Sequence, residues 1–468
     1  MKKKSILLVL FGLVLGLSVA YAAELINSKD ISFSNGTTNL KANNVQDAIE
    51  EIYNKTIDNS SCKNVSAPKL GEGLVPVTIE NDGTVKYADT SKSWYNYCDK
   101  IWANAVILEN NASYSVGDTI SEADIQSYFV WIPKYKYKLW NTGTASEGIH
   151  EIEIVFDETN TTDVEGVSCK TPMTSGESGN CNNGEYMTHP SFISMNANGF
   201  WVGKFETGYK GATSAAAAQV NANDTSKVIV KPNVYSWRGI TVKNIFETSY
   251  NYKRDLDSHM MKNTEWGAVA FLSHSKYGTN KEINLNNNSS YKTGFSSSPT
   301  ASQLTIPGDS GDGNNFNTTY NTAIGYKAST TGNISGVYDM SGGSHEYMSS
   351  YLNGKTGVSG FTASTLSNYD SKYFDVYSSS SKESTFQYRI LGDATAEMGP
   401  FKNYADGNNA AVYHSTWYND SSGFIESDYP WFNRGGDFTY GVTAGIFDFR
   451  RFTGGAATYL SFRIVLTS

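Results

Sequence analysis

The chain has 468 residues, of which 39% are hydrophobic and 13% aromatic, and its formal net charge is −9. This length is enough for two or three domains with a large core, and the composition argues against a disordered chain. Lys and Arg do not gather into long runs. Because phosphate binding needs a concentrated basic face, the sequence disfavours a nucleic-acid partner.

The N-terminus predicts a signal peptide over residues 1–22. Three lysines at positions 2–4 precede an apolar run from Ile6 to Val19, which ends in Ala20-Tyr21-Ala22, the small-residue pattern of a cleavage site. An uncleaved membrane anchor is the alternative, because the run approaches the length that spans a bilayer. In both cases the rest of the chain is secreted or at the cell surface, and it contacts the membrane only if the signal is retained.

The four cysteines predict disulfides, because an even number in an exported chain usually pairs. Proximity in the sequence favours the pairs Cys62–Cys98 and Cys169–Cys181. A zinc site is the competing interpretation, and the absence of Cys-x-x-Cys or His-x-x-x-His spacing weakens it.

Residues 23–60 resemble a helical stalk. Apolar residues at Val45, Ala48, Ile49, Ile52 and Tyr53 fall on one face of a helix that starts near Asn43 or Asn44. A lone helix of this length is marginal in water. It therefore needs a partner, either the next domain or copies of itself, in which case the protein is a homo-oligomer.

A small β-rich module is expected over residues 61–110, and one large irregular domain over 111–468. In the first, two strands at 75–79 and 84–87 flank an Asp-Gly turn, the signature of a hairpin. In the second, short strands are expected at 129–132 and 199–205. One helix there is expected to be capped by Asn263 or Thr264 and to stop near Gly278.

Several segments of the large domain resemble the sulfatase-modifying-factor (formylglycine-generating enzyme) family. They are, in the family's order, Gly199–Glu206, Asn263–Trp266, Gly332–Tyr347, and Arg434–Gly436 followed by Ser461–Leu466. The resemblance implies a C-type lectin-like fold of the α+β class over residues 111–468. Fold alone does not imply function.

The family's oxidising enzymes use paired cysteines near the C-terminal motif to bind copper, and no cysteine lies there in this chain. Relatives that use iron hold it with histidines from an added helical domain, and the six histidines here show no paired spacing. We therefore expect neither copper nor iron, and a protein that is not an enzyme. A related oxidoreductase is one alternative, and a structural surface or pilus-tip subunit is another.

The same resemblance implies a calcium site in the glycine-rich turn. Calcium prefers hard oxygen ligands, and a glycine-rich turn presents carbonyls. The ligands would be the carboxylates of Asp339 and Glu346, with carbonyls from Gly342 and Ser344. The alternative is a turn in which Asp339 caps the backbone and Glu346 pairs with an arginine.

The segment from Arg434 to Arg463 alternates scaffold-like and display-like residues. Its glycines, Ala444–Phe447, Phe449 and Phe462 are expected to set backbone and core. Between them lie charged, aromatic and aliphatic residues without a clear period, of the types that binding hot spots favour. With two nearby tryptophans, the predicted ligand-binding residues are Asp437, Phe438, Thr439, Tyr440, Val442, Thr443, Asp448, Arg450, Arg451, Phe452, Thr453, Tyr459, Trp417 and Trp431.

This arrangement resembles the variable proteins of diversity-generating retroelements, in which a lectin-fold scaffold presents diversified C-terminal positions. The resemblance implies an adhesion or recognition protein whose ligand is a protein or glycan on another cell, phage or host surface. A fixed binding surface is the alternative, since residues such as Phe438 and Val442 also suit a core.

Overall fold

The computed structural model describes residues 31–32, 42–49, 64–109, 112–138, 149, 151–158, 186–297, 318–377, 393, 402–403 and 414–467. The chain divides into two compact units, 1–63 and 64–468. Within the described ranges, no helix is both long enough and apolar enough to cross a membrane. The signal peptide expected over 1–22 lies outside the described residues.

The first unit contains the expected start of the stalk helix. Residues 45–49 are helical. The side chain of Asn44 accepts a hydrogen bond from the Asp47 amide at 2.8 Å, which satisfies one of the free donors at the helix start. Asn44 is therefore the cap, as predicted, while the rest of the predicted stalk helix lies outside the described residues.

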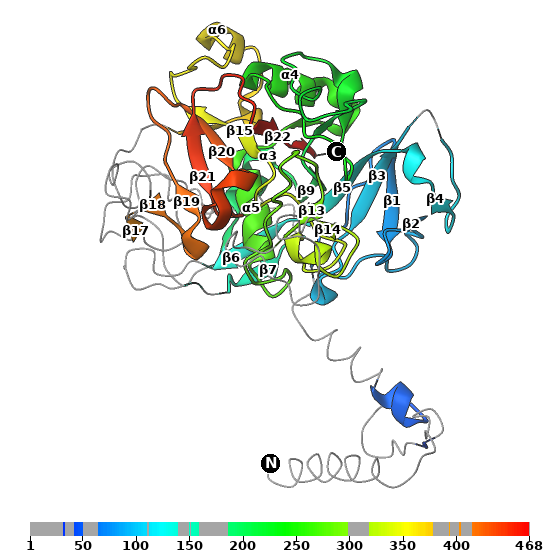
Figure 1. The fold of residues 1–468 in the computed structure, drawn as a ribbon. Helices are drawn as coiled ribbons and strands as arrows, with labels where there is room; N and C mark the ends of the chain where they lie inside the picture. The colour runs from blue at the N-terminus through cyan, green and yellow to red at the C-terminus, as the bar shows by residue number, and fades with distance from the viewer. Residues whose placement is uncertain are drawn as a thin grey trace, which may run out of the picture. The chain divides into compact units, whose positions relative to one another are not determined.

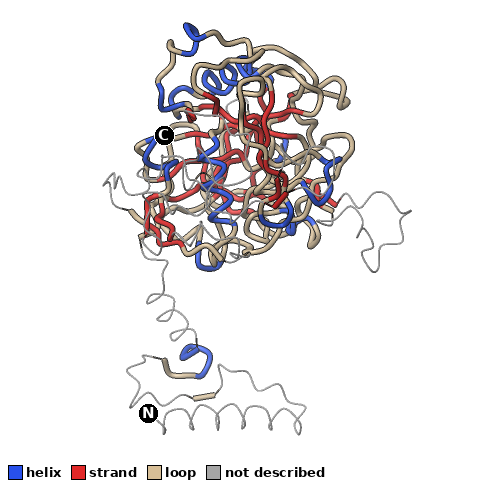
Figure 2. Tube along the Cα trace, turned by 90° about the vertical axis from the view of Figure 1, so that its left-hand side faces the viewer, coloured by secondary structure: helices blue, strands red, loops and turns tan. Residues whose placement is uncertain are grey.

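The second unit is a mixed α+β fold with more strand than helix, built around two eight-stranded open sheets (Figure 1). Figure 2 shows that strands form the centre of this unit, with helices and long loops around them. In spatial order, the first sheet contains β12 (His259–Met260), β23 (Ile464–Leu466), β9 (Gly199–Gly203), β5 (Ile125–Pro133), β3 (Asn104–Leu108), β1 (Leu74–Ile79), β2 (Val85–Tyr87) and β4 (Thr119–Ile120).

The predicted hairpin is confirmed. β1 and β2 pair antiparallel, with Val77 opposite Tyr87, and the turn closes through a hydrogen bond from the Glu80 amide to the Thr84 carbonyl at 2.9 Å. Gly83 in this turn has a φ of +92°, which favours glycine. The Asp-Gly signal thus placed the turn correctly.

The separate module expected over 61–110 is not found. β1 pairs with β3, and β3 pairs with β5, so the hairpin belongs to the sheet that also contains β9 and the C-terminal β23. The second compact unit begins at Asn64, so β1, β2 and β3 fall in the same unit as the rest of this sheet. Sequence composition suggested a boundary there because it does not reveal which sheet a strand joins.

The second sheet carries the C-terminal segment. β15 lies between β16 and β20, and β22 also pairs with β15 in parallel. Its strands are β16 (Asp375–Tyr377), β15 (His345–Leu352), β20 (Trp431–Arg434), β21 (Phe449–Phe452), β19 (Ser421–Ser422), β18 (His414–Ser415), β17 (Lys402–Asn403) and β22 (Leu460–Phe462).

Smaller elements cover these sheets. The helices are α3 (Pro190–Met195), α4 (Val242–Tyr252), α5 (Asn263–Ser273) and α6 (Ala363–Leu366). The short sheets are β7-β6-β8 (Ile154–Phe156, Tyr135–Lys138, Tyr186–Thr188), β10-β11 (Gly208–Tyr209, Val228–Ile229) and β13-β14 (Phe295–Ser296, Thr318–Thr319).

The predicted helix is α5, with shifted ends. The cap is Lys262, whose amide donates to the Glu265 carboxylate at 2.9 Å, so Glu265 satisfies the helix start from inside the first turn. The helix ends at Ser273, where the amide of the C-cap residue His274 donates to the Ala270 and Phe271 carbonyls. The expected stop near Gly278 was therefore about one turn late.

Candidate functional site

In the turn predicted to bind calcium, Asp339 to Glu346, the Asp339 carboxylate is occupied by hydrogen bonds from protein groups. Both carboxylate oxygens of the buried Asp339 accept the Gly294 amide, at 2.9 and 3.0 Å, and one also accepts the Asn286 side-chain amide at 2.8 Å. Asp339 itself has a φ of +59°, typical of a tight turn. Gly342 donates its amide to the Gly435 carbonyl, and Ser344 donates its amide to Glu206 at 2.7 Å.

Glu346, the second expected calcium ligand, pairs with a buried arginine. Arg463 donates from Nε to one carboxylate oxygen at 3.0 Å and from Nη2 to the other at 2.5 Å, and neither side chain is exposed. A calcium ion here would face a guanidinium on the same carboxylate, so this donor set does not fit a divalent cation. Among the described residues, no cluster of three acidic, His or Cys side chains could hold a metal.

The predicted scaffold of the C-terminal segment is buried. Arg434 donates to the Asn263 side chain at 2.8 Å, and the Trp266 indole donates to the Ile446 carbonyl at 2.7 Å. These contacts join the C-terminal segment to the start of α5, two stretches that are far apart in the sequence. Burial lowers the pKa of Arg434 to about 10, so it remains charged at neutral pH.

A short 3-10 turn, η9 (Phe438–Thr443), projects between β20 and β21. Asp437 caps it: its Oδ1 accepts the Thr439 amide at 2.8 Å and the Thr439 hydroxyl at 2.5 Å. Gly436, with a φ of +70°, brings the chain close enough that a Cβ there would lie 2.4 Å from that of Ala444. The turn is therefore anchored at both ends.

Tyr440 stands on this turn with 41% of its surface exposed. The Arg450 guanidinium lies over its ring at 3.8 Å, a cation–π contact, and Arg450 Nε also donates to Asp448 at 2.9 Å. Asp448 is buried, which raises its pKa to about 6, while Arg450 opposes this rise. The pair with Asp448 holds the guanidinium in place beneath the tyrosine ring.

His345 forms the floor beneath these residues. Its ring contacts the rings of Tyr440 and Tyr459, with centroid distances of 5.1 and 5.9 Å. Burial, aided by the nearby Arg450, lowers its pKa well below the usual value, so it is neutral at physiological pH. His345 lies in the Gly332–Tyr347 motif, where the sequence favours a packed or solvent-facing side chain over a metal ligand, and the structure packs it.

Eight of the predicted ligand-binding residues are at least partly exposed. They come from η9, β21 and the loop before β22. We call them the display surface: Phe438, Thr439, Tyr440, Thr443, Arg450, Phe452, Thr453 and Tyr459. Tyr291, from a distant part of the chain, contacts this surface through Phe438, with ring centroids 4.9 Å apart, and no local sequence signal indicated it.

Five predicted contact residues are buried, so the prediction was wrong for them. Asp437 and Asp448 hold the turn and Arg450, as described above. Arg451 points inward, donates to the Phe424 carbonyl at 2.9 Å and pairs with a glutamate. Trp417 and Trp431 are core residues; the Trp431 indole donates to the Thr356 carbonyl at 3.0 Å. The side chain of Val442 is outside the described part of the structure.

Of the four cysteines, Cys98 alone lies among the described residues, and it is disulfide-bonded. The other three cysteines, Cys62, Cys169 and Cys181, lie outside those residues, and the partner of Cys98 is therefore not identified among the described residues. The expected pairing therefore stays a prediction.

No protein-family model and no curated protein matches this sequence. Among solved structures, the chain is similar to one titled "Major Tropism Determinant I1 Variant", with 10% identity and a TM-score of 0.26. The match covers 87% of this chain and 97% of that chain. A TM-score this low does not establish a shared fold, so the C-type lectin-like type remains a prediction and the fold stands as mixed α+β with open sheets.

Proposed function

We propose that this protein is a secreted or surface-exposed, non-catalytic binding protein, and that the display surface contacts its ligand. One observation carries the proposal: the exposed Tyr440 is stacked on Arg450, above a turn whose scaffold is buried. Tyr and Arg are the residues that dominate binding energy at interfaces, and rigid presentation lowers the entropic cost of binding. The ligand is a protein or glycan on another cell, phage or host surface.

The division between scaffold and display residues also supports a diversified segment. Display residues can change without loss of the fold, because the neighbouring glycines, Arg434 and Phe449 hold the backbone and core. In this proposal the fold is C-type lectin-like, and the helix that begins after Asn44 lets copies of the chain associate.

The test is binding of the labelled protein to a panel of bacterial and host cells and to a glycan array. The double variant Tyr440→Ala/Arg450→Ala should lose affinity by about 30-fold or more, the ratio that matches a hot spot of ~2 kcal/mol. Tyr186→Ala is the matched control, because Tyr186 is 37% exposed on β8, outside the display surface. Unchanged binding by the double variant would show that another face is used.

Diversification has its own test, which is to sequence the locus in related strains. Replacements should concentrate at the eight display residues and spare Asp437, Asp448 and Arg434. Replacements spread evenly along the chain would contradict this part of the proposal.

A further inference from the structure

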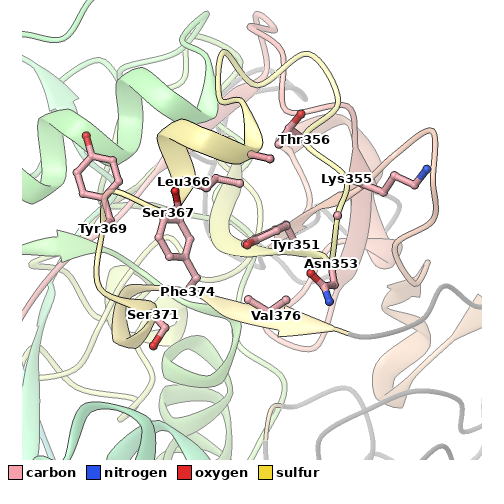
Figure 3. Close-up of a pocket in the computed structure, with 12 residues that line it drawn as sticks. Tyr351, Asn353, Lys355, Thr356, Leu366, Ser367, Tyr369, Ser371, Phe374 and Val376 are labelled. Carbon is pink, nitrogen blue, oxygen red and sulfur yellow. The ribbon is translucent and has the colours of Figure 1, made fainter.

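A cavity of about 290 Å³ lies at the opposite end of β15 from Tyr440 and Arg450 of the display surface. Tyr351 lines it, whereas His345, six residues earlier on the same strand, lies under Tyr440. Six residues of strand span about 20 Å at ~3.3 Å per residue, so the two places are separate. The cavity lies between α6, the end of β15 and the edge strand β16 (Figure 3).

The base of this cavity is apolar and aromatic. Tyr351 and Phe374 meet edge to face, with ring centroids 5.8 Å apart, and Tyr351 packs at 5.0 Å against the buried Trp431. Leu366 of α6 and Val376 of β16 complete the apolar wall. The Tyr351 ring is thus fixed from behind while it stays partly exposed toward the cavity.

Polar groups at the rim have no hydrogen-bond partner among the described residues. They are the Tyr351 hydroxyl, the side-chain amide of Asn353 and the Ser371 hydroxyl, all in residues that line the cavity. Figure 3 shows Asn353 beside the Tyr351 ring. Ser367 differs, because its hydroxyl donates to the Ser364 carbonyl at 2.9 Å. The rim therefore offers both donors and acceptors to a ligand.

The charges of the residues that line the cavity argue against an ionic ligand. None of the twelve lining residues is acidic, and the one basic residue, Lys355, extends away from the rings of Tyr351 and Phe374 in Figure 3. A cation would lose its hydration here without meeting an acidic side chain, and an anion on the aromatic base would lose its hydration away from Lys355. A wholly apolar ligand would leave the Tyr351 hydroxyl and the Asn353 amide desolvated and unpaired, which is also costly.

We propose that this cavity binds one neutral monosaccharide ring, presented as a single unit of a glycan. A pyranose has an apolar C–H face, which packs on an aromatic ring, and hydroxyls around its edge, which pair with amides and hydroxyls. The cavity volume is at the low end of the ~300–1,000 Å³ typical of ligand sites, which suits one ring. Tyr351 provides the stacking face, and Asn353 and Ser371 bind the hydroxyls.

The probes are galactose, glucose, mannose and N-acetylglucosamine, added separately to the full chain and followed by saturation-transfer NMR. At least one should bind in the millimolar range. Tyr351→Phe and Asn353→Ala should each weaken binding about 3- to 10-fold, the loss expected for one net hydrogen bond. Asn368→Ala is the matched control, since Asn368 is exposed next to α6 but does not line the cavity.

A blocking variant completes the test. Ala363→Trp, at the exposed start of α6, should fill the cavity and abolish the signal without changing the melting temperature. Tyr440→Ala/Arg450→Ala should keep the sugar signal, so that this proposal and the proposed function fail separately. Absence of a signal for all four sugars, a signal that persists in Ala363→Trp, or tighter binding of cyclohexanol that is insensitive to Tyr351→Phe would each overturn the proposal.

Discussion

The buried pair of Glu346 and Arg463 shows that a glutamate in a glycine-rich motif can serve either as a metal ligand or as an ion-pair partner. The glutamate sits in a motif that suggested a metal ligand, yet it accepts two hydrogen bonds from an arginine 117 residues away. The same guanidinium also donates to the Gly203 and Tyr338 carbonyls, at 2.7 and 3.0 Å. It therefore joins β9, β15 and the C-terminal strands, and its role is structural.

Replacing Arg463 by Met should destabilise the protein by about 3–5 kcal/mol, because the carboxylate of Glu346 is then left buried without a partner. Unfolding in urea measures this change. Lys86→Met is the control: Lys86 pairs with Glu80, but both side chains are more than 40% exposed, so the expected loss is at most about 1 kcal/mol. Equal losses for the two variants would contradict the structural role of Arg463.

Titration of Glu346 should make the free energy of unfolding depend on pH. Burial raises its pKa from 4.5 to about 7, and Asp339 adds to this rise while Arg463 opposes it. The folded state therefore binds this proton more tightly than the unfolded state. Its contribution to stability is complete below about pH 4.5 and is lost as the pH rises through about 7.

Glu346→Gln tests this expectation, because glutamine keeps the shape but does not titrate. The slope of unfolding free energy against pH, which approaches about −1.4 kcal/mol per unit for one such carboxyl, should become flatter in the variant between pH 4.5 and 7. Identical slopes for the two proteins would mean that Glu346 has a normal pKa in the folded state.

At the scale of elements, η9 depends on the glycines before it. Gly436→Ala combines a disfavoured φ of +70° with a Cβ only 2.4 Å from that of Ala444. Gly211→Ala separates the two effects, because Gly211 has a φ of +85° with open space around it. We expect about 1 kcal/mol of destabilisation for Gly211→Ala and more than ~2 kcal/mol for Gly436→Ala.

Hydrogen exchange locates the effect of Gly436→Ala. The amides of Tyr440 and Ala444 donate to the Asp437 and Gly441 carbonyls within η9, so both should exchange faster in Gly436→Ala and be unchanged in Gly211→Ala. Protected η9 amides in Gly436→Ala would show that the turn tolerates a side chain there.

The sequence was informative where the signal was local. The Asp-Gly turn of β1–β2 and the cap at Asn44 depend on residues within one turn or hairpin, and so does the start of α5, where Glu265 accepts the Lys262 amide. The apolar face of α4, formed by Val242, Ile245, Phe246 and Tyr252, carries the same kind of signal and was overlooked.

The candidate site was predictable only in part, because exposure is a property of the whole fold. The sequence located the segment and its scaffold residues, including Phe449 and Phe462. It could not separate Arg450, which faces Tyr440, from Arg451, which points inward, since alternation along β21 becomes meaningful only once the sheet is known. Tyr291 and the cavity at Tyr351 depend on contacts between distant segments, which leave no local pattern.

At the scale of the molecule, the first sheet joins the two ends of the second unit. β1 begins at Leu74 and β23 ends at Leu466, and both belong to the same eight strands. Between them, β3 and β5 are almost wholly buried: Val106, Phe129 and Val130 have no exposed surface. The N-terminal strands therefore cover core that the C-terminal part of the chain cannot cover alone.

Two truncations test this arrangement against the boundary that composition suggested. A chain of residues 64–468 keeps every strand of both sheets and should melt cooperatively, although it lacks Cys62, the predicted partner of Cys98. A chain of residues 111–468 lacks β1, β2 and β3, which exposes one edge of β5 and its apolar side chains. We expect it to aggregate or to show no cooperative transition in calorimetry. Cooperative melting of 111–468 at the temperature of 64–468 would instead mean that the N-terminal strands are an appendage, as the sequence suggested, and that the core around Val130 is complete without them.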